Sequence, residues 1–224
     1  SVPSSPRKEY VWEGRDTAVY AAVPAVHDSL ASFTMVWNSA RTPREYMNTV
    51  QPVIYEMFLA ELGMLSEEYI KDGLRGHDIP YAEVRSGFRT SIQSSDDEVF
   101  SISVSVAPKD FQEALKTVAA AVGRIDAGRT DVRDLMRMKR ICMDQGKEQI
   151  LQPYMSNSEH VDRCVSAFLY NGSLASLKTK VDFLAGRVLA DTTELRLFNN
   201  ISSALLDPEK NMTVSYTSPV SEDS

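Results

Sequence analysis

Two neighbouring runs of the chain alternate strictly from position to position. The first run sets Ala82, Val84, Ser86, Phe88, Thr90 and Ile92 against Glu83, Arg85, Gly87, Arg89, Ser91 and Gln93. The second run sets Phe100, Ile102, Val104 and Val106 against Ser101, Ser103 and Ser105. Period-two alternation is typical of strands with one buried and one polar face. Because turn-forming residues at 94–97 separate the two runs, we predict an antiparallel hairpin.

Three shorter segments also have the composition of strands. Residues 17–23 and 31–37 are rich in β-branched, aromatic and small side chains, and a turn-like segment at 24–29 lies between them. We predict two antiparallel strands there. Residues 212–217 predict a last strand, which returns to the same sheet.

A long helix is expected after the second strand. Thr42, Pro43 and Glu45 are three helix-start signals within four residues. The positions expected to be buried recur at steps of three and four, and they are Tyr46, Val50, Ile54, Met57, Phe58 and Leu62. Pro52 falls inside this pattern, so a kink or a break is expected there.

The second half of the chain has mostly helical patterns. An apolar stripe ends near Gly128 and consists of Phe111, Leu115, Val118, Val122 and Ile125. Thr130 is the expected cap of a helix that carries Leu135, Met138, Ile141 and Cys142. A further helix is expected from about Ser158 to Asn171 and Gly172, and two short helices have possible capping boxes at 179–182 and 191–194.

The predicted order of elements is β-β-α-β-β-α-α-α-α-α-β, which indicates an α+β fold. We expect a two-layer sandwich in which a mostly antiparallel sheet carries helices on one face. The chain has no internal repeat and no linker-like stretch between its elements, so residues 15–218 are interpreted as a single domain. Residues 1–14 and 219–224, which carry Ser-Pro segments, are interpreted as linkers.

Composition and charge narrow the classes of function. The 224 residues are 43% hydrophobic and 25% charged, which is ordinary for a globular domain. No apolar run approaches the roughly 18 to 20 residues of a membrane span, and no signal-peptide pattern is recognised. The net charge of −7 argues against a nucleic-acid partner, since phosphate binding needs concentrated Lys and Arg. The one basic cluster, which is interpreted as a solvated helix face, consists of Arg133, Arg137, Lys139 and Arg140 among Asp131, Asp134 and Asp144.

Candidate catalytic chemistry is sparse. Zinc hydrolases place two histidines and a carboxylate on one helix as H-x-x-E-H or H-E-x-x-H, whereas the three histidines here are His27, His77 and His160. The nearest match runs from Ser156 to His160 and has serine in place of the first histidine, so we interpret it as a chance match. No nucleophile elbow and no Gly-rich phosphate loop occurs either. We therefore expect no catalytic residue, no metal ligand and no cofactor in this chain.

The two cysteines, Cys142 and Cys164, lie at apolar phases of helical patterns. Buried, unreactive thiols are the simplest interpretation, and the spacing leaves a disulfide between them open. Cys164 and His160 would be four residues apart on one helix. Nucleophilic chemistry by that pair is the less favoured interpretation, because a surface-and-core pair fits the same spacing.

One connector has residues that could contact a peptide. The segment 72–81 leads from the long helix into the central hairpin and contains Arg75 and Tyr81. An Arg and a Tyr at such a junction could face a cleft and hold a peptide carbonyl. The alternative interpretation is a plain connector in which Gly73 and Gly76 serve turns and Tyr81 packs on the sheet edge.

A resemblance to the insulinase-like (pitrilysin-type, M16) zinc proteases covers roughly residues 15 to 218. The passage 100–115, Phe-Ser-Ile-Ser-Val-Ser-Val-Ala-Pro-Lys-Asp-Phe-Gln-Glu-Ala-Leu, is similar to that family's strand-to-helix passage. The strand ending at 35–37 before a long helix, the turn and helix start at 128–135, and the closing strand at 211–216 fit in the same order. The order and spacing of these pieces support the resemblance.

The resemblance implies a function at the level of a larger protein. Such proteases consist of repeated α+β domains in two halves that enclose a chamber, and zinc is bound by H-x-x-E-H and a later Glu in the active half. Because this sequence lacks that motif, it resembles a non-catalytic companion domain, with zinc expected elsewhere in the parent protein. The expected partners are the other domains and a peptide substrate. The family's Arg and Tyr that contact substrate would correspond to Arg75 and Tyr81, although the spacing is one residue short and Pro80 intervenes.

The same resemblance suggests a bacterial parent in the periplasm or cell envelope, by analogy alone. It also leaves two other interpretations open. A catalytically dead M16 relative would act as a binding or assembly scaffold, and it would differ from an active parent in lacking H-x-x-E-H upstream. An unrelated α+β enzyme would instead gather titratable groups with perturbed pKa values in one cleft.

Overall fold

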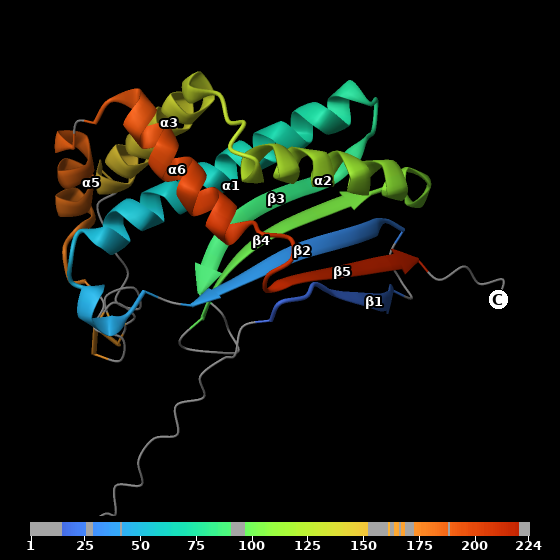
Figure 1. Cartoon of the computed structure of the whole chain (residues 1–224), viewed down its shortest axis with the longest axis horizontal. Helices are drawn as coiled ribbons and strands as arrows, with labels where there is room; N and C mark the ends of the chain where they lie inside the picture. Colours follow the sequence, from blue (N-terminus) through green and yellow to red (C-terminus); the bar gives the residue numbers. More distant parts are fainter. Residues whose placement is uncertain are drawn as a thin grey trace, which may run out of the picture.

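The computed structural model describes residues 15–25, 29–40, 42–90, 97–151, 161, 164–165, 167–168, 173–187 and 189–219 (Figure 1). Its strands are β1 (Val19–Ala25), β2 (Ala31–Ala40), β3 (Tyr81–Thr90), β4 (Asp97–Val106) and β5 (Met212–Pro219). Its helices are α1 (Gln51–Gly76), α2 (Phe111–Asp126), α3 (Val132–Leu151), α5 (Leu177–Gly186) and α6 (Asp191–Leu205). This is an α+β fold, as the patterns predict.

The five strands form one mixed sheet in the order β1-β5-β2-β4-β3. Strand β2 pairs antiparallel with β4 and β5, and β3 pairs antiparallel with β4, whereas β1 and β5 are parallel. The first two strands do not form a hairpin with each other, because β5 lies between them. Composition identified these strands, but it does not determine which neighbour from the far end of the chain completes the sheet.

The predicted hairpin is confirmed in β3 and β4. Val84 lies opposite Val104 and Phe88 opposite Phe100, with an irregularity between Tyr81 and Glu83. Strand β4 begins at Asp97, which was expected to end the turn, and residues 91–96 are outside the described part of the chain.

The two faces of the sheet differ in chemistry. The helix-facing side is apolar and buried, and it includes Phe33, Met35, Trp37, Phe100, Ile102, Val104, Met212 and Val214. The opposite side is partly exposed and rich in hydroxyl groups, and it includes Ser32, Thr34, Ser101, Ser103, Ser105, Thr213, Ser215 and Thr217. Cross-strand hydrogen bonds join Ser32 to Thr217 and Thr34 to Ser103. Because side chains alternate across a strand, the period-two pattern produces both faces.

The start of α1 differs from the prediction. A 3-10 turn at Arg44–Tyr46 follows Pro43, and the α-helix itself begins at Gln51. Pro52 therefore lies in the first turn, where its missing N–H costs no hydrogen bond, and it causes neither a kink nor a break. Tyr46 and Val50 precede the helix and are exposed rather than buried.

Three of the predicted helix caps also differ. Thr130 does not cap α3; the Asp131 carboxylate accepts a hydrogen bond from the backbone N–H of Arg133 at 2.8 Å instead. The Ser176 hydroxyl caps α5 by accepting from the N–H of Thr179 at 3.1 Å. The residue before α6 is Ala190, which has no capping side chain.

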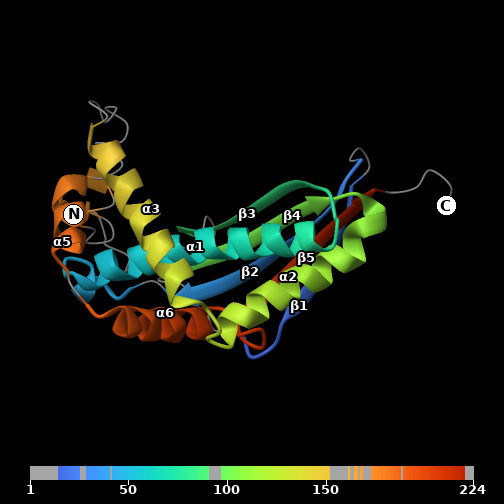
Figure 2. The same cartoon turned by 90° about the horizontal axis from the view of Figure 1, so that it is seen from above.

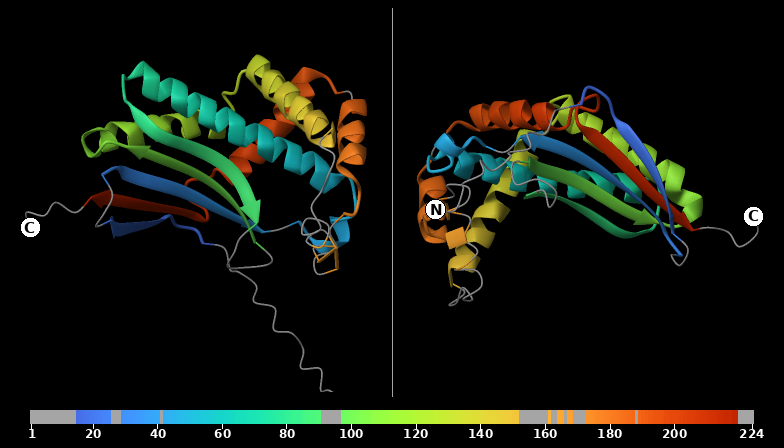
Figure 3. Two further views of the ribbon diagram at one scale, coloured as in Figure 1. Left: turned by 180° about the vertical axis from the view of Figure 1, so that it is seen from behind. Right: turned by 90° about the horizontal axis from the view of Figure 1, so that it is seen from below.

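The helices lie on one side of the sheet, but not all of them pack directly against it. α1 packs against β3 and α2 against β2, whereas α3 packs on α1, α5 and α6 (Figures 1 and 2). α5 contacts α3 and lies toward one end of the molecule. The view from below shows most of the hydroxyl-rich face uncovered by the described helices (Figure 3).

A glycine allows α1 to approach the sheet closely. A Cβ atom at Gly63 would lie 3.3 Å from the carbonyl oxygen of Ser86 and 3.4 Å from the Cα of Gly87, which are backbone atoms. We therefore expect Gly63→Val to lower the free energy of unfolding by about 3 kcal/mol, since the strand must move. Urea denaturation would measure the change. Gly76→Val is the control because a Cβ there meets nothing within 4 Å; equal losses in both variants would contradict the packing explanation.

Candidate functional site

The connector predicted to contact a peptide lies between α1 and β3. The Arg75 side chain in the last turn of α1 is 62% exposed and donates to the Asp72 carboxylate at 2.6 Å. Asp78 has a φ of 54°, and the N–H of Ile79 bonds to the carbonyl of Leu74 at 2.9 Å. These bonds close the helix end and turn the chain into β3.

Tyr81 is the first residue of β3 and packs against the edge of the core. It lies opposite Val106 of β4. Among the described residues no hydrogen bond or ion pair joins Arg75 to Tyr81, so their joint role in substrate contact stays a prediction.

The histidines and cysteines are dispersed. His77 is the exposed C-cap of α1, whereas His27, His160 and the segment that resembles a zinc motif are outside the described residues. Cys142 and Cys164 are free thiols, and Cys164 is exposed, contrary to the expectation of burial. Burial, with the charge of Glu61 as a smaller cause, raises the pKa of the Cys142 thiol to about 12. Cys142 is therefore a protonated, weakly nucleophilic group at neutral pH.

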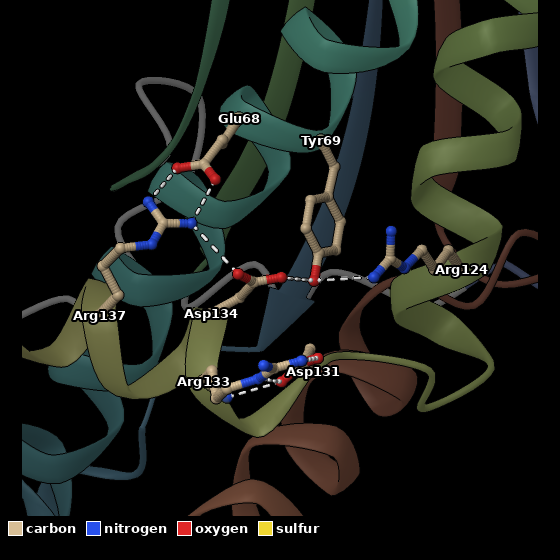
Figure 4. Close-up of polar contacts among 7 residues, drawn as sticks. All are labelled: Glu68, Tyr69, Arg124, Asp131, Arg133, Asp134 and Arg137. Carbon is tan, nitrogen blue, oxygen red and sulfur yellow. Dashed lines mark hydrogen bonds and ion pairs between the residues drawn. The ribbon is translucent and has the colours of Figure 1, made fainter.

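A polar network joins three helices on the outer side of the helical layer (Figure 4). Arg137 of α3 donates two hydrogen bonds to the Glu68 carboxylate of α1, one of them at 2.6 Å, and a third to Asp134 at 3.3 Å. Asp134 accepts a hydrogen bond from the Tyr69 hydroxyl at 2.9 Å. Arg124 of α2 donates to the Tyr69 oxygen at 3.3 Å, with its guanidinium carbon 4.1 Å from the ring centroid.

Tyr69 is the central residue of this network and is only 9% exposed. Burial, together with the hydrogen bond to Asp134, raises the pKa of its phenol to about 12, so it stays a donor at physiological pH. The network has a protonated phenol, paired carboxylates and paired guanidinium groups. Its chemistry suits holding α1, α2 and α3 in position rather than general-base or nucleophilic catalysis.

The interpretation of the basic cluster as a solvated helix face is only partly right. The ion pair between Arg133 and Asp131 is exposed and local, as expected (Figure 4). Arg137 and Lys139, however, reach α1 and α6 respectively. The helical spacing of these residues indicates only that they share one helix. The partners of Arg137 and Lys139 are 55 or more positions away in the chain, so the sequence pattern does not identify them.

A second set of charged side chains lies between four helices, and we call it the Glu61–Glu194 cluster. It consists of Glu61 of α1, Lys139 of α3, Arg187 after α5 and Glu194 of α6. Glu194 is 1% exposed and pairs with Lys139 at 3.0 Å and with Arg187 at 3.1 Å. Glu61 is also 1% exposed, and its Oε1 has no hydrogen-bond partner among the described residues.

The environment keeps Glu61 protonated. Burial first, and the charge of Glu194 second, raise the pKa of Glu61 to about 8, against the opposing effect of Lys139 and Arg187. The sequence offered no signal for this cluster, because Glu61 lies in a helical stretch that reads as an ordinary mixture of apolar and charged positions.

The described residues do not fit a zinc centre. They include no group of three or more His, Cys, Asp or Glu side chains that could hold a metal ion. Among the described residues the one histidine is His77, which lies at the C-terminal end of α1, away from the Glu61–Glu194 cluster. Nor do they include a helix long and apolar enough to cross a bilayer.

Comparison with known proteins gives similarity in structure but not in sequence. No family model and no curated protein matches the sequence. The periplasmic protease PqqL from Escherichia coli has a similar structure at a TM-score of 0.73 and 12% identity, covering 96% of this chain and 24% of that chain. A predicted insulinase family protease from Yersinia pestis matches at a TM-score of 0.65 and 12% identity, covering 99% of this chain and 46% of that chain. A peptidase M16 inactive domain from Pseudomonas fluorescens matches at a TM-score of 0.60 and 13% identity, covering 92% of this chain and 44% of that chain.

The chain thus spans less than half the length of each of these three structures. The likeness extends over nearly the whole of this chain, so it concerns the complete arrangement of sheet and helices rather than one motif. The structural similarity expected from the passage at 100–115 and its neighbours is confirmed, and the chain has the fold of a domain of M16 insulinase-family peptidases.

Proposed function

We propose that this chain is a non-catalytic domain of a zinc metalloendopeptidase, which completes the chamber around a peptide and supports a zinc domain elsewhere in the parent protein. One observation carries the proposal. The fold matches part of much larger M16 structures over at least 92% of this chain, yet the full sequence has neither H-x-x-E-H nor H-E-x-x-H. A domain of this fold without the ligands needs another domain for catalysis.

The hydroxyl-rich face of the sheet is the surface we propose for the chamber wall. The described helices leave most of it uncovered (Figure 3). Its Ser and Thr side chains can donate and accept hydrogen bonds without selecting for one charge. Such a face suits a wall that contacts polypeptides of varied sequence.

Two proteins would test this function. One is the 224-residue chain, and the other is a longer product of the same gene that includes the neighbouring domain. Zinc is measured by mass spectrometry and cleavage by a quenched fluorescent peptide library. We expect zinc and cleavage in the longer protein alone. Zinc-dependent cleavage by the short chain would overturn the proposal, and the absence of both from the longer protein would favour the scaffold of a catalytically dead relative.

Arg75 gives a kinetic prediction that rests on the same function. In the longer protein, Arg75→Ala is expected to raise KM about fivefold with little change in kcat, because a contact with bound peptide is removed in ground and transition states alike. Arg133→Ala is the matched control, since Arg133 is also exposed and paired with an acidic neighbour, Asp131, but lies on α3 rather than on the sheet. An unchanged KM in Arg75→Ala, or the same rise in both variants, would remove Arg75 from the substrate-contact role; Tyr81→Phe tests its predicted partner in the same way.

A further inference from the structure

An apolar groove of about 450 Å³ follows α2 over the strands β2 and β5. Its floor includes Trp37, which is 1% exposed, and its helical wall runs from Phe111 to Asp126. At 1.5 Å per residue, this stretch of α2 is about 22 Å long. The groove therefore extends along the whole of α2, and the described part of the chain leaves it unfilled.

The two ends of the groove differ. At one end the rings of Phe111 and Tyr216 meet at a centroid distance of 6.0 Å. Tyr216 is 42% exposed and Tyr20, on β1, is 72% exposed, so the rim on the β1 side is aromatic and open. At the other end lie Asp126 and Pro208. Exposed tyrosines beside an apolar floor are typical of surfaces that contact another polypeptide.

Asp126 supplies a charge at the apolar groove. Its backbone carbonyl accepts a hydrogen bond from Ser203, but its carboxylate has no hydrogen-bond or ion-pair partner among the described residues. Burial and the neighbouring Asp207 raise the pKa of this carboxyl. Asp207 itself pairs with Lys210 at 3.2 Å, which leaves Asp126 as the carboxylate available to a cation in the groove.

We propose that the groove docks an apolar segment of a neighbouring domain of the parent protein, with a lysine or arginine of that segment on Asp126. The proposal rests on the proposed function, in which this chain packs beside further domains. A length of about 22 Å takes six or seven extended residues, which suits a chain segment better than a compact small molecule. The unpaired carboxylate selects a basic residue, and the open aromatic rim admits the rest of the segment.

The test uses the 224-residue chain and two ten-residue peptides made of leucine, phenylalanine, alanine and serine, one ending in lysine and the other in glutamate. In isothermal titration calorimetry we expect the lysine peptide to bind about fivefold more tightly than the glutamate peptide. Asp126→Asn is expected to abolish this preference. The wild-type preference must also weaken as salt is raised, because the contact is a partly exposed charge pair.

A second variant fills the groove without disturbing the fold. Gly123 lines the groove, and a Cβ there meets nothing within 4 Å, so Gly123→Leu places its side chain in open space. The variant is expected to bind both peptides more than about tenfold more weakly than wild type, while its thermal unfolding stays like that of wild type. Gly186→Leu is the matched control, since a Cβ at Gly186 also meets nothing and Gly186 lies outside the groove.

Binding of neither peptide, binding without charge preference, or binding that Gly123→Leu leaves intact would each overturn the proposal. A concentration-dependent dimer that Gly123→Leu dissociates would assign the groove to a second copy of the chain and would overturn it as well. The experiment measures neither zinc nor cleavage, so its failure would leave the proposed peptidase role standing. Conversely, a longer protein without zinc and cleavage would overturn that role and leave the binding result intact.

Discussion

Replacing Glu61 with glutamine is expected to stabilise the domain by several kcal/mol at pH 8 and by little at pH 5. The pKa of Glu61 is about 8 in the folded protein, against an ordinary value of 4.5. Between these values the folded state holds a proton that the unfolded chain releases. This contribution to stability is therefore fully present below pH 4.5 and is lost as the pH rises through 8, by about 1.4 kcal/mol per pH unit. Glutamine is neutral at every pH, so the variant escapes the loss.

The measurement is urea denaturation of wild type and Glu61→Gln at pH 5, 6, 7 and 8. The difference in free energy of unfolding between the two proteins must widen in favour of the variant as the pH rises. Glu113→Gln is the control, because Glu113 is half-exposed and pairs with Lys116 on the surface of α2. Its difference from wild type is expected to stay within about 0.5 kcal/mol throughout. Parallel pH curves for wild type and Glu61→Gln would show that Glu61 ionises normally.

The parts of the fold that were predicted from sequence depend on local periodicity. The hairpin of β3 and β4 and the stripe of α2 follow from alternation at two and at three to four residues, which neighbouring positions alone determine. The helix starts were less accurate, because Thr42 and Thr130 have the same chemistry as true caps. Whether a side chain caps depends on backbone conformation, and Asp131 rather than Thr130 has the required geometry.

What sequence reasoning missed depends on contacts between distant segments. β5 enters the sheet between β1 and β2 from nearly 180 positions away, and no local pattern encodes that order. The groove along α2 exists because of this arrangement, since β5 supplies part of its floor. The Glu61–Glu194 cluster likewise brings together four helices. By contrast, the absence of H-x-x-E-H was visible in the sequence itself, and it carries the functional proposal more than any single contact does.

Glu194→Gln is expected to destabilise the domain by about 3 kcal/mol at pH 7. The substitution removes the carboxylate that pairs with Lys139 and Arg187, whose side chains are 21% and 12% exposed. Breaking a buried pair from one side leaves charge without a partner, which costs about 3–5 kcal/mol for full burial and somewhat less here because Lys139 keeps some contact with solvent. Urea denaturation measures the loss, and a change below about 1 kcal/mol would show that water replaces the carboxylate.

The two glutamates are also expected to be coupled, so that the effect of Glu61→Gln depends on Glu194. With Glu194 present, a negative charge on Glu61 is opposed by burial and by a second carboxylate. With Glu194 replaced by glutamine, Lys139 and Arg187 favour the charged form of Glu61, which then takes over part of the lost pairing. Glu61→Gln should therefore stabilise the Glu194→Gln variant at pH 8 by less than it stabilises wild type, since burial still opposes the charge. A double-mutant cycle at pH 8 measures this coupling, and additive effects within about 0.5 kcal/mol would mean that the two carboxylates do not share the same cations.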